Sequence, residues 1–127
     1  MELSENQISY KIIGVALEIH RTYGVGLLEK AYEDILAYEL KELGLDVKAQ
    51  LSLPLKHKDL VIENAYRLDL LVNEKVIIEV KAVSELHPIV DAQVLTYLKL
   101  TKLKLGIIIN FHSKLLKDGI KRKVNKL

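Results

Sequence analysis

Several residue types are missing or scarce in this chain of 127 residues, and each absence narrows its chemistry. There is no cysteine, so disulfides and thiolate metal sites are excluded, and oxygen ligands would favour a hard cation such as Mg²⁺. No apolar run approaches the roughly 20 residues of a membrane span. The first residues, MELSENQ, lack the basic start and apolar stretch of a secretion signal. We therefore expect a single cytoplasmic domain over residues 1–127, without a membrane partner.

The charges are unevenly distributed. The net charge is only +2, yet residues 1–50 hold nine acids and five bases, whereas residues 99–127 hold nine bases and one acid. The basic segment hints at a polyanionic partner, although a solvated lysine-rich surface explains it equally well. No aromatic ladder accompanies it, so we expect recognition by shape rather than by base sequence. The candidate phosphate contacts are Lys99, Lys102, Lys104, Lys121, Arg122 and Lys123.

Hydrophobic periodicity predicts a mixture of helices and strands. Ser4 and Gln7 form a capping box at the start of the first helix, and Pro88 suits the start of the third. No regular element is predicted for the basic segment after Gly119. The predicted elements are helices at about 4–21 and 27–43, three strands within 47–82, a helix at about 88–102, and a buried strand at 105–111. The order α-α-β-β-β-α-β predicts an α/β (α+β) fold with a mixed central sheet flanked by helices.

Two carboxylates interrupt the aliphatic stretch RLDLLVNEKVIIEVKA. A two-residue turn would pair Val72 with Lys75 and send Asp69 and Glu79 to opposite faces of the sheet. A three-residue turn pairs Val72 with Val76 and brings Asp69 directly opposite Glu79. We predict this second register, because it leaves the other face wholly apolar. That face consists of Leu68, Leu70, Val72, Val76, Ile78, Val80 and Ala82.

Carboxylates facing each other on adjacent strands repel, since their Cβ atoms lie about 4.5–5.5 Å apart. One interpretation is a structural ion-pair cluster with Arg67 and Lys81, which the same register places opposite each other. The other is a divalent ion, Mg²⁺ or Mn²⁺, held by Asp69, Glu79 and the carbonyl of Val80, with waters completing the shell. Lys81 would then orient or help to deprotonate the attacking water. We favour the ion, because phosphodiester hydrolysis uses all of these parts.

Short motifs support this interpretation. The D-x9-E-x-K spacing across the predicted hairpin resembles the PD-(D/E)XK nuclease superfamily. The stretch GLLEKAY resembles the signature of the small GxxExxY proteins, whose matching positions are Gly26, Glu29 and Tyr32. IHRTYG precedes it, and RLD, EVKA, QVLTY and INF follow in family order, so the resemblance covers about residues 12–125. EVKA departs from the ELKA of relatives, which is harmless if only a carbonyl binds metal, and KHKDLVIENAY follows the family loosely.

The resemblance implies a restriction-endonuclease-like core, similar to RecB-like nucleases, and a metal-dependent nuclease acting on nucleic acid, with DNA favoured over RNA. It implies that Asp69 and Glu79 are metal ligands, that Lys81 is the catalytic lysine, and that Glu29 adds a further acidic group to the metal site. From the residues alone, Glu29 could equally be an exposed acid that stabilises the first turn of its helix.

Gln93 and Tyr97 lie one helical turn apart and, as the resemblance implies, would hold the substrate backbone or brace the lysine. The alternative is that Tyr97 belongs to the core and Gln93 to the surface. Arg67 joins the candidate phosphate contacts. The four histidines show no metal-ligand spacing.

Three functions remain open: a nuclease, a non-catalytic nucleic-acid-binding or regulatory module on the same fold, and a structural protein with an ion-pair network. A homodimer is also expected, because so small a domain needs a second copy to grip both strands of a duplex.

Overall fold

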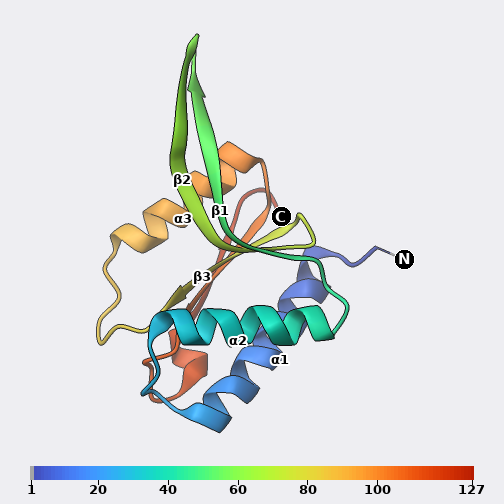
Figure 1. The fold of residues 1–127 in the computed structure, drawn as a ribbon, viewed down its shortest axis with the longest axis vertical. Coiled ribbons are helices and arrows are strands. Elements are labelled where there is room, and N and C mark those ends of the chain that lie inside the picture. Colours follow the sequence, from blue (N-terminus) through green and yellow to red (C-terminus); the bar gives the residue numbers. More distant parts are fainter. Residues whose placement is uncertain (1) are drawn as a thin grey trace.

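The structure, a computed structural model, describes residues 2–127 and contains a central sheet covered by helices on both faces (Figure 1). The elements are α1 (Glu5–Tyr23), α2 (Glu29–Glu42), β1 (Val47–His57), β2 (Leu60–Val72), β3 (Val76–Lys81), α3 (Ile89–Thr101), β4 (Leu105–Asn110), the 3-10 helix η1 (Leu116–Gly119) and β5 (Ile120–Val124). The strands follow the order β1-β2-β3-β4-β5, and only β3 and β4 run parallel. The predicted fold class is confirmed. No helix within residues 2–127 has the length and apolar character of a membrane span.

The last strand corrects the sequence prediction. The basic segment after Gly119 forms β5, which pairs antiparallel with β4 at the edge of the sheet. Its sequence, IKRKV, has charged residues at its three central positions, so it lacks the alternation of a half-buried strand. Charged residues are typical of edge strands, where they discourage pairing with another chain.

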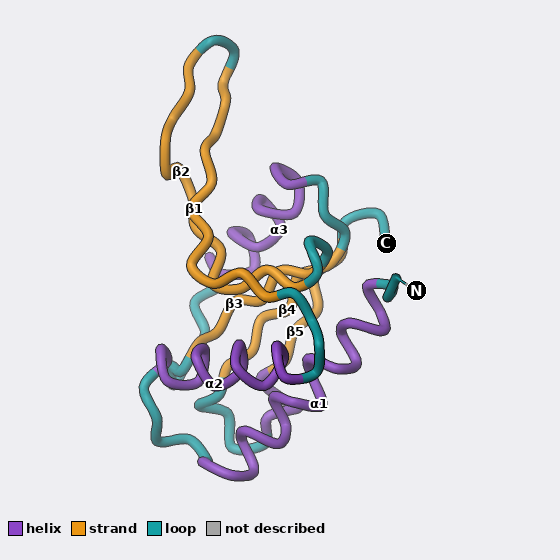
Figure 2. Tube along the Cα trace, turned by 45° about the vertical axis from the view of Figure 1, so that its right-hand side comes forward, coloured by secondary structure: helices purple, strands orange, loops and turns teal. Residues whose placement is uncertain are grey.

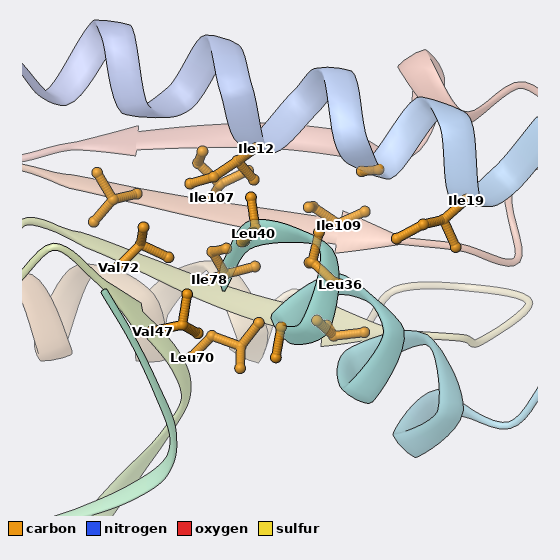
Figure 3. Close-up of a cluster of buried hydrophobic side chains, with 14 of the residues drawn as sticks. Ile12, Ile19, Leu36, Leu40, Val47, Leu70, Val72, Ile78, Ile107 and Ile109 are labelled. Atoms are coloured by element: carbon orange, nitrogen blue, oxygen red, sulfur yellow. The ribbon is translucent and has the colours of Figure 1, made fainter. Parts of the chain in front are cut away.

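The two faces of the sheet hold separate apolar clusters. α1 and α2 cover one face and α3 the other (Figure 2). Figure 3 shows Ile12 and Ile19 of α1, and Leu36 and Leu40 of α2, packed around the strands of the first face. The strand residues of that cluster include Leu70, Val72, Ile78, Ile107 and Ile109. The cluster under α3 is smaller and contains Val90, Val94 and Leu98 with Leu71, Ile77 and Ile108.

The turn between β2 and β3 sets the register that was predicted. Val72 pairs with Val76, so the turn has three residues. Asn73 and Glu74 both adopt left-handed conformations, with φ of 52° and 56°. The Asn73 side chain accepts a hydrogen bond from the main-chain N–H of Asp46 at 2.8 Å, which ties the turn to the start of β1.

The alternation of side chains along β2 is broken at Asp69, so residues two positions apart lie on opposite faces of the sheet. Leu70 packs in the α1/α2 cluster, whereas Leu68 packs under α3. The alternation along β1 is broken in the same way at Gln50, which has a left-handed φ of 51° and lies between the pairs formed by Ala49 and Leu51. The prediction that Leu68 shares the face of Leu70 is therefore wrong. The strict alternation of β2 is broken between these two residues, opposite the left-handed backbone of Gln50 on β1.

Beyond this point, β1 and β2 continue as a two-stranded arm that projects from the body (Figure 1). The arm includes the stretch KHKDLVIENAY, where the family resemblance was loose. The ladder shifts register between Leu53 and Leu55, on either side of Pro54. Three consecutive apolar residues near the tip, Leu60, Val61 and Ile62, are 57%, 51% and 42% exposed.

α3 packs closely on the sheet at Gly106 of β4. A Cβ atom at this position would lie 2.6 Å from Cγ1 of Val94, closer than real side-chain contacts. The absence of a side chain therefore sets the distance between α3 and the sheet.

Candidate functional site

The candidate site begins where β2 and β3 separate. Their ladder ends at the pair Leu70 and Ile78, and the next two residues, Asp69 and Glu79, turn their side chains into the gap. The main-chain N–H of Val80 donates to Asp69 Oδ2 at 2.8 Å, and the main-chain N–H of Asp69 donates to Glu79 Oε1 at 3.4 Å. Each carboxylate thus replaces a backbone partner that the opposite strand has lost. The register brings the two acids together, as predicted.

The gap holds more negative charge than its surroundings neutralise. Burial, followed by the charge of Asp69, raises the pKa of Glu79 to about 8. Burial also raises the pKa of Asp69, and the negative charge of Glu33 adds to this effect. The positive charge of Lys81 acts in the opposite direction on both carboxyl groups. A cation between the carboxylates would relieve this repulsion.

The main chain of Val80 also faces the gap. In an antiparallel ladder, the N–H and C=O of a paired residue point to the same neighbouring strand. Because the N–H of Val80 reaches Asp69 on β2, its carbonyl points toward β2 as well. The carbonyl of Lys81 points the other way, since it accepts from Phe111 at 2.8 Å. The gap thus contains two carboxylates and a carbonyl oxygen.

The ion-pair interpretation gains no support from the contacts. Within residues 2–127, neither Arg67 nor Lys81 forms a salt bridge with an acid. Arg67 is exposed and lies beyond the end of the β2–β3 ladder, so it is not paired with Lys81.

Sequence reasoning missed Glu33, a buried acid beside the pair. Its side chain is only 3% exposed, and both of its oxygens accept from Nε2 of Gln50, at 2.7 and 2.8 Å. Lys30 Nζ lies 3.2 Å from Glu33 Oε2. A signal was present, because Glu33 lies three residues before Leu36 and therefore on the buried side of an amphipathic helix. Gln50 offered no comparable signal.

Glu29 lies at the end of β3. Its side chain is exposed, and its Oε1 accepts from the N–H of Ala82 at 3.2 Å. Its negative charge contributes to the raised pKa of Asp69, although less than burial and Glu33 do. Glu29 is thus near the gap without entering it.

Tyr32, the last position of the GxxExxY-like motif, is fully buried. Its ring stacks on Phe111 with centroids 4.4 Å apart, and its hydroxyl accepts from Leu27 N–H at 3.1 Å and donates to the carbonyl of Gly24. This tyrosine therefore fixes the turn between α1 and α2, and with it the start of the helix that carries Glu29 and Glu33.

α3 approaches the gap from the other face. Tyr97 stacks on Tyr66 of β2 with centroids 5.2 Å apart, and burial raises its pKa, with smaller contributions from Glu79 and Asp69. Tyr97 therefore lies within electrostatic range of the pair. Gln93, one turn earlier, is exposed.

The predicted phosphate contacts do not share one surface. Lys121 and Lys123 lie 3.5 and 2.8 Å from carboxylate oxygens of Asp91 on α3. Arg122 donates to Asn6 Oδ1 on α1 at 2.6 Å, on the opposite face of the sheet. The remaining members, Lys99, Lys102 and Lys104, are exposed in and after the last turn of α3.

The donor set suits a hard divalent cation. Carboxylate and carbonyl oxygens, with waters, are the ligands that Mg²⁺ and Mn²⁺ take in proteins. Across residues 2–127, no three His, Cys, Asp or Glu side chains are grouped closely enough to hold a metal by themselves. Asp69, Glu79 and the carbonyl of Val80 would therefore supply part of a coordination shell, and their unfavourable charge balance fits a cation.

Comparison with known proteins identified one family. A family model described as the PD-(D/E)XK nuclease superfamily matches residues 6–123. No curated protein and no solved structure matched the chain.

Proposed function

The chain belongs to the PD-(D/E)XK nuclease superfamily, and we propose that it is a divalent-metal-dependent nuclease that hydrolyses nucleic-acid phosphodiester bonds. DNA is the first substrate to test, ahead of RNA. The observation that supports this most strongly is the pair of carboxylates, Asp69 and Glu79, that face each other in the gap, where burial first and the neighbouring acids second raise the pKa of both groups. Groups with strongly shifted pKa values are concentrated at functional sites.

The proposed roles follow from position. Asp69, Glu79 and the carbonyl of Val80 hold the cation, Mg²⁺ or Mn²⁺, and Glu29 joins through the outer part of its shell. When bound, the cation lowers the pKa of water and neutralises charge on the phosphoryl oxygens. Lys81, two residues from Glu79 on the same strand, orients the attacking water and the phosphate.

Further residues would contact the substrate. Tyr97 lies near the carboxylates, and Gln93 lies one turn away on the exposed side of the same helix. We assign both to the substrate backbone or to the positioning of Lys81. Phosphate contacts beyond the site are assigned to Arg67, Lys99, Lys102, Lys121, Arg122 and Lys123.

Within the superfamily, we place the chain with the small GxxExxY, RecB-like proteins. The support is the motif itself, together with the way Tyr32 fixes the turn before α2. A cytoplasmic location stays a prediction from the sequence.

A non-catalytic nucleic-acid-binding module is the second candidate. It is favoured by the charge of residues 99–127, which hold nine bases and one acid. This function predicts salt-dependent binding of nucleic acid without metal-dependent cleavage.

Two measurements test the proposal. We expect calorimetry to detect Mn²⁺ binding by the wild-type protein, and labelled duplex DNA, single-stranded DNA or RNA to be cleaved in Mg²⁺. Asp69→Asn and Glu79→Gln each remove one ligand charge with little change in shape, and both should abolish cleavage and weaken Mn²⁺ binding at least tenfold. Asp118→Asn, an exposed acid in η1, is the matched control and should behave as wild type. Equal activity in all four proteins, or binding without any cleavage, would contradict the nuclease assignment.

A further inference from the structure

The outer surfaces of α1 and α2, which face away from the sheet, form an open and mainly apolar groove of about 1050 Å³. Large apolar side chains at the groove remain uncovered. Tyr10 is 83% exposed, Tyr23 is 51% exposed, and Leu43 at the end of α2 is 53% exposed. Exposed apolar surface gathered in one place is typical of an interface. None of the residues that line this groove belongs to the candidate site.

The α1 side of the groove is symmetric about its middle. The helix runs from Glu5 to Tyr23, so Gly14 lies at its midpoint. No heavy atom of another element lies within 4 Å of the position where a Cβ of Gly14 would be. A helix with an open glycine at its centre can approach a second helix closely, toward the short end of the usual range of about 8–10 Å between axes.

An antiparallel second α1, crossing between Gly14 and Val15, would match this surface chemically. In a two-fold interface, each pair of facing residues occurs twice. Lys11 would face Glu18 of the second copy, because the two residues lie seven positions apart and therefore on the same side of the helix. Both positions line the groove.

The charges favour a second copy of the chain over an unrelated partner. Lys11 forms no ion pair within residues 2–127. Glu18 is exposed and pairs only with Arg21 of its own helix among these residues. The antiparallel arrangement gives Lys11 an acidic partner, and the two-fold axis forms this pair twice. An unrelated protein would need acidic and basic groups at matching positions of its own surface.

The size of the surface is also appropriate. A helix of 19 residues is about 28 Å long, and two neighbouring helices are about 20 Å wide. The projected area of the two helices is therefore roughly 600 Å². The accessible surface is larger than this projection because side chains protrude from it, and it approaches the ~800 Å² per partner of stable interfaces. We propose that this groove is the interface of a homodimer in which the two α1 helices pack antiparallel about a two-fold axis near Gly14.

A charge exchange tests the proposed contact. The full-length protein should sediment as a dimer. Lys11→Glu and Glu18→Lys each place like charges opposite each other twice, so each should weaken the dimer about tenfold or more. The double variant Lys11→Glu/Glu18→Lys restores opposite charges and should return the dissociation constant to within about threefold of wild type. Lys41→Glu, on the exposed surface of α2, is the control for a general charge effect.

A second variant separates loss of contact from loss of folding. Gly14→Leu fills open space on an exposed helical surface, so the monomer should fold with an unchanged or higher melting temperature, while the close crossing becomes impossible. We expect a folded monomer. The proposal is overturned if the wild type is a monomer at several hundred micromolar, if Gly14→Leu remains a dimer, or if the double exchange fails to restore dimerisation although circular dichroism shows a folded chain. Because sedimentation needs neither metal nor substrate, this result is independent of nuclease activity.

Discussion

Two buried glutamates, Glu33 of α2 and Glu79 of β3, have very different surroundings in the fold. Glu33 is 3% exposed and Glu79 is 7% exposed. Both oxygens of Glu33 accept from the Gln50 amide, and Lys30 lies 3.2 Å away. Glu79 instead accepts a long main-chain hydrogen bond of 3.4 Å and shares its gap with the carboxylate of Asp69.

This contrast distinguishes an acid that stabilises the fold from an acid that is available for metal binding. Burying a carboxylate costs free energy unless hydrogen bonds and opposite charges compensate it. The protein supplies that compensation to Glu33 from its own side chains, so Glu33 can be a permanent part of the core. Glu79 receives much less compensation from the protein. A bound cation would therefore lower the cost of burying its charge.

The largest expected effect comes from removing the cationic side chain that acts on the Asp69–Glu79 pair. Lys81→Met keeps a long flexible side chain but loses the charge, and we expect single-turnover cleavage to fall about 10²–10⁴-fold. Mn²⁺ affinity should stay the same or rise, because a competing positive charge is removed. Lys41→Met, on the exposed surface of α2, is the matched control. Wild-type cleavage by the Lys81 variant would show that the lysine is not needed.

Removing the compensated acid should destabilise the fold. In Glu33→Ala, the Gln50 amide loses both acceptors in a partly buried place, so the free energy of unfolding should fall by about 1–2 kcal/mol. Glu33→Gln keeps an acceptor and should cost less, and Glu42→Ala on the exposed side of α2 should cost little. Urea unfolding measures all three. A neutral Glu33→Ala would remove the distinction between the two glutamates.

Neutralising Glu79, the acid whose burial is poorly compensated, should instead raise the free energy of unfolding. The pKa of Glu79 is raised from 4.5 to about 8 in the folded, metal-free protein. Between these pH values the folded state holds a proton that the unfolded chain has released, so the free energy of unfolding falls as pH rises. Glu79→Gln removes this loss, and above pH 8 we expect it to be more stable than metal-free wild type by about 1–2 kcal/mol.

The check is urea unfolding in a chelator at pH 5 and pH 9. The stabilisation should be absent at the lower pH and should shrink when Mg²⁺ is added to the wild type. A variant that is less stable at pH 9 would mean that Glu79 is compensated after all.

The smallest effect concerns the side chain of Val80. Because only the main chain of Val80 faces the gap, Val80→Ile should leave Mn²⁺ affinity within about twofold and change stability by no more than about 1.5 kcal/mol. Calorimetry and urea unfolding give both values. A large loss of metal affinity with normal stability would show that the side chain itself shapes the gap.

Part of this comparison could be read from the sequence. Asp69 and Glu79 were predicted to meet because only one turn length gives β2 and β3 a coherent apolar face, and the pairing of Val72 with Val76 confirms that turn. Alternation is a local property and survives in the sequence. The same reasoning failed for Leu68, because the alternation of β2 is broken at Asp69, opposite the left-handed backbone of Gln50.

The surroundings of Glu33 could not be predicted from the sequence, because they depend on a contact between residues that are distant in the chain. Glu33 contacts Gln50 across 17 positions of the chain, and Gln50 has a left-handed backbone that its residue type does not reveal. β5 was missed for a different reason, since an edge strand needs little apolar patterning to pair with its neighbour.

Gly106 carries no functional group, yet it governs how near the chemistry of α3 can come to that of the sheet. Even one methyl group at this position would lie 2.6 Å from Cγ1 of Val94, so Val94 or the helix that carries it would have to shift. Tyr97 lies on the same helix, one turn beyond Val94, so any shift of the helix would also move its ring. The spacing between the Tyr97 ring and the carboxylates thus depends on the absence of a side chain on β4. A search for functional residues by chemical type alone would overlook Gly106, although it helps to set the width of the site.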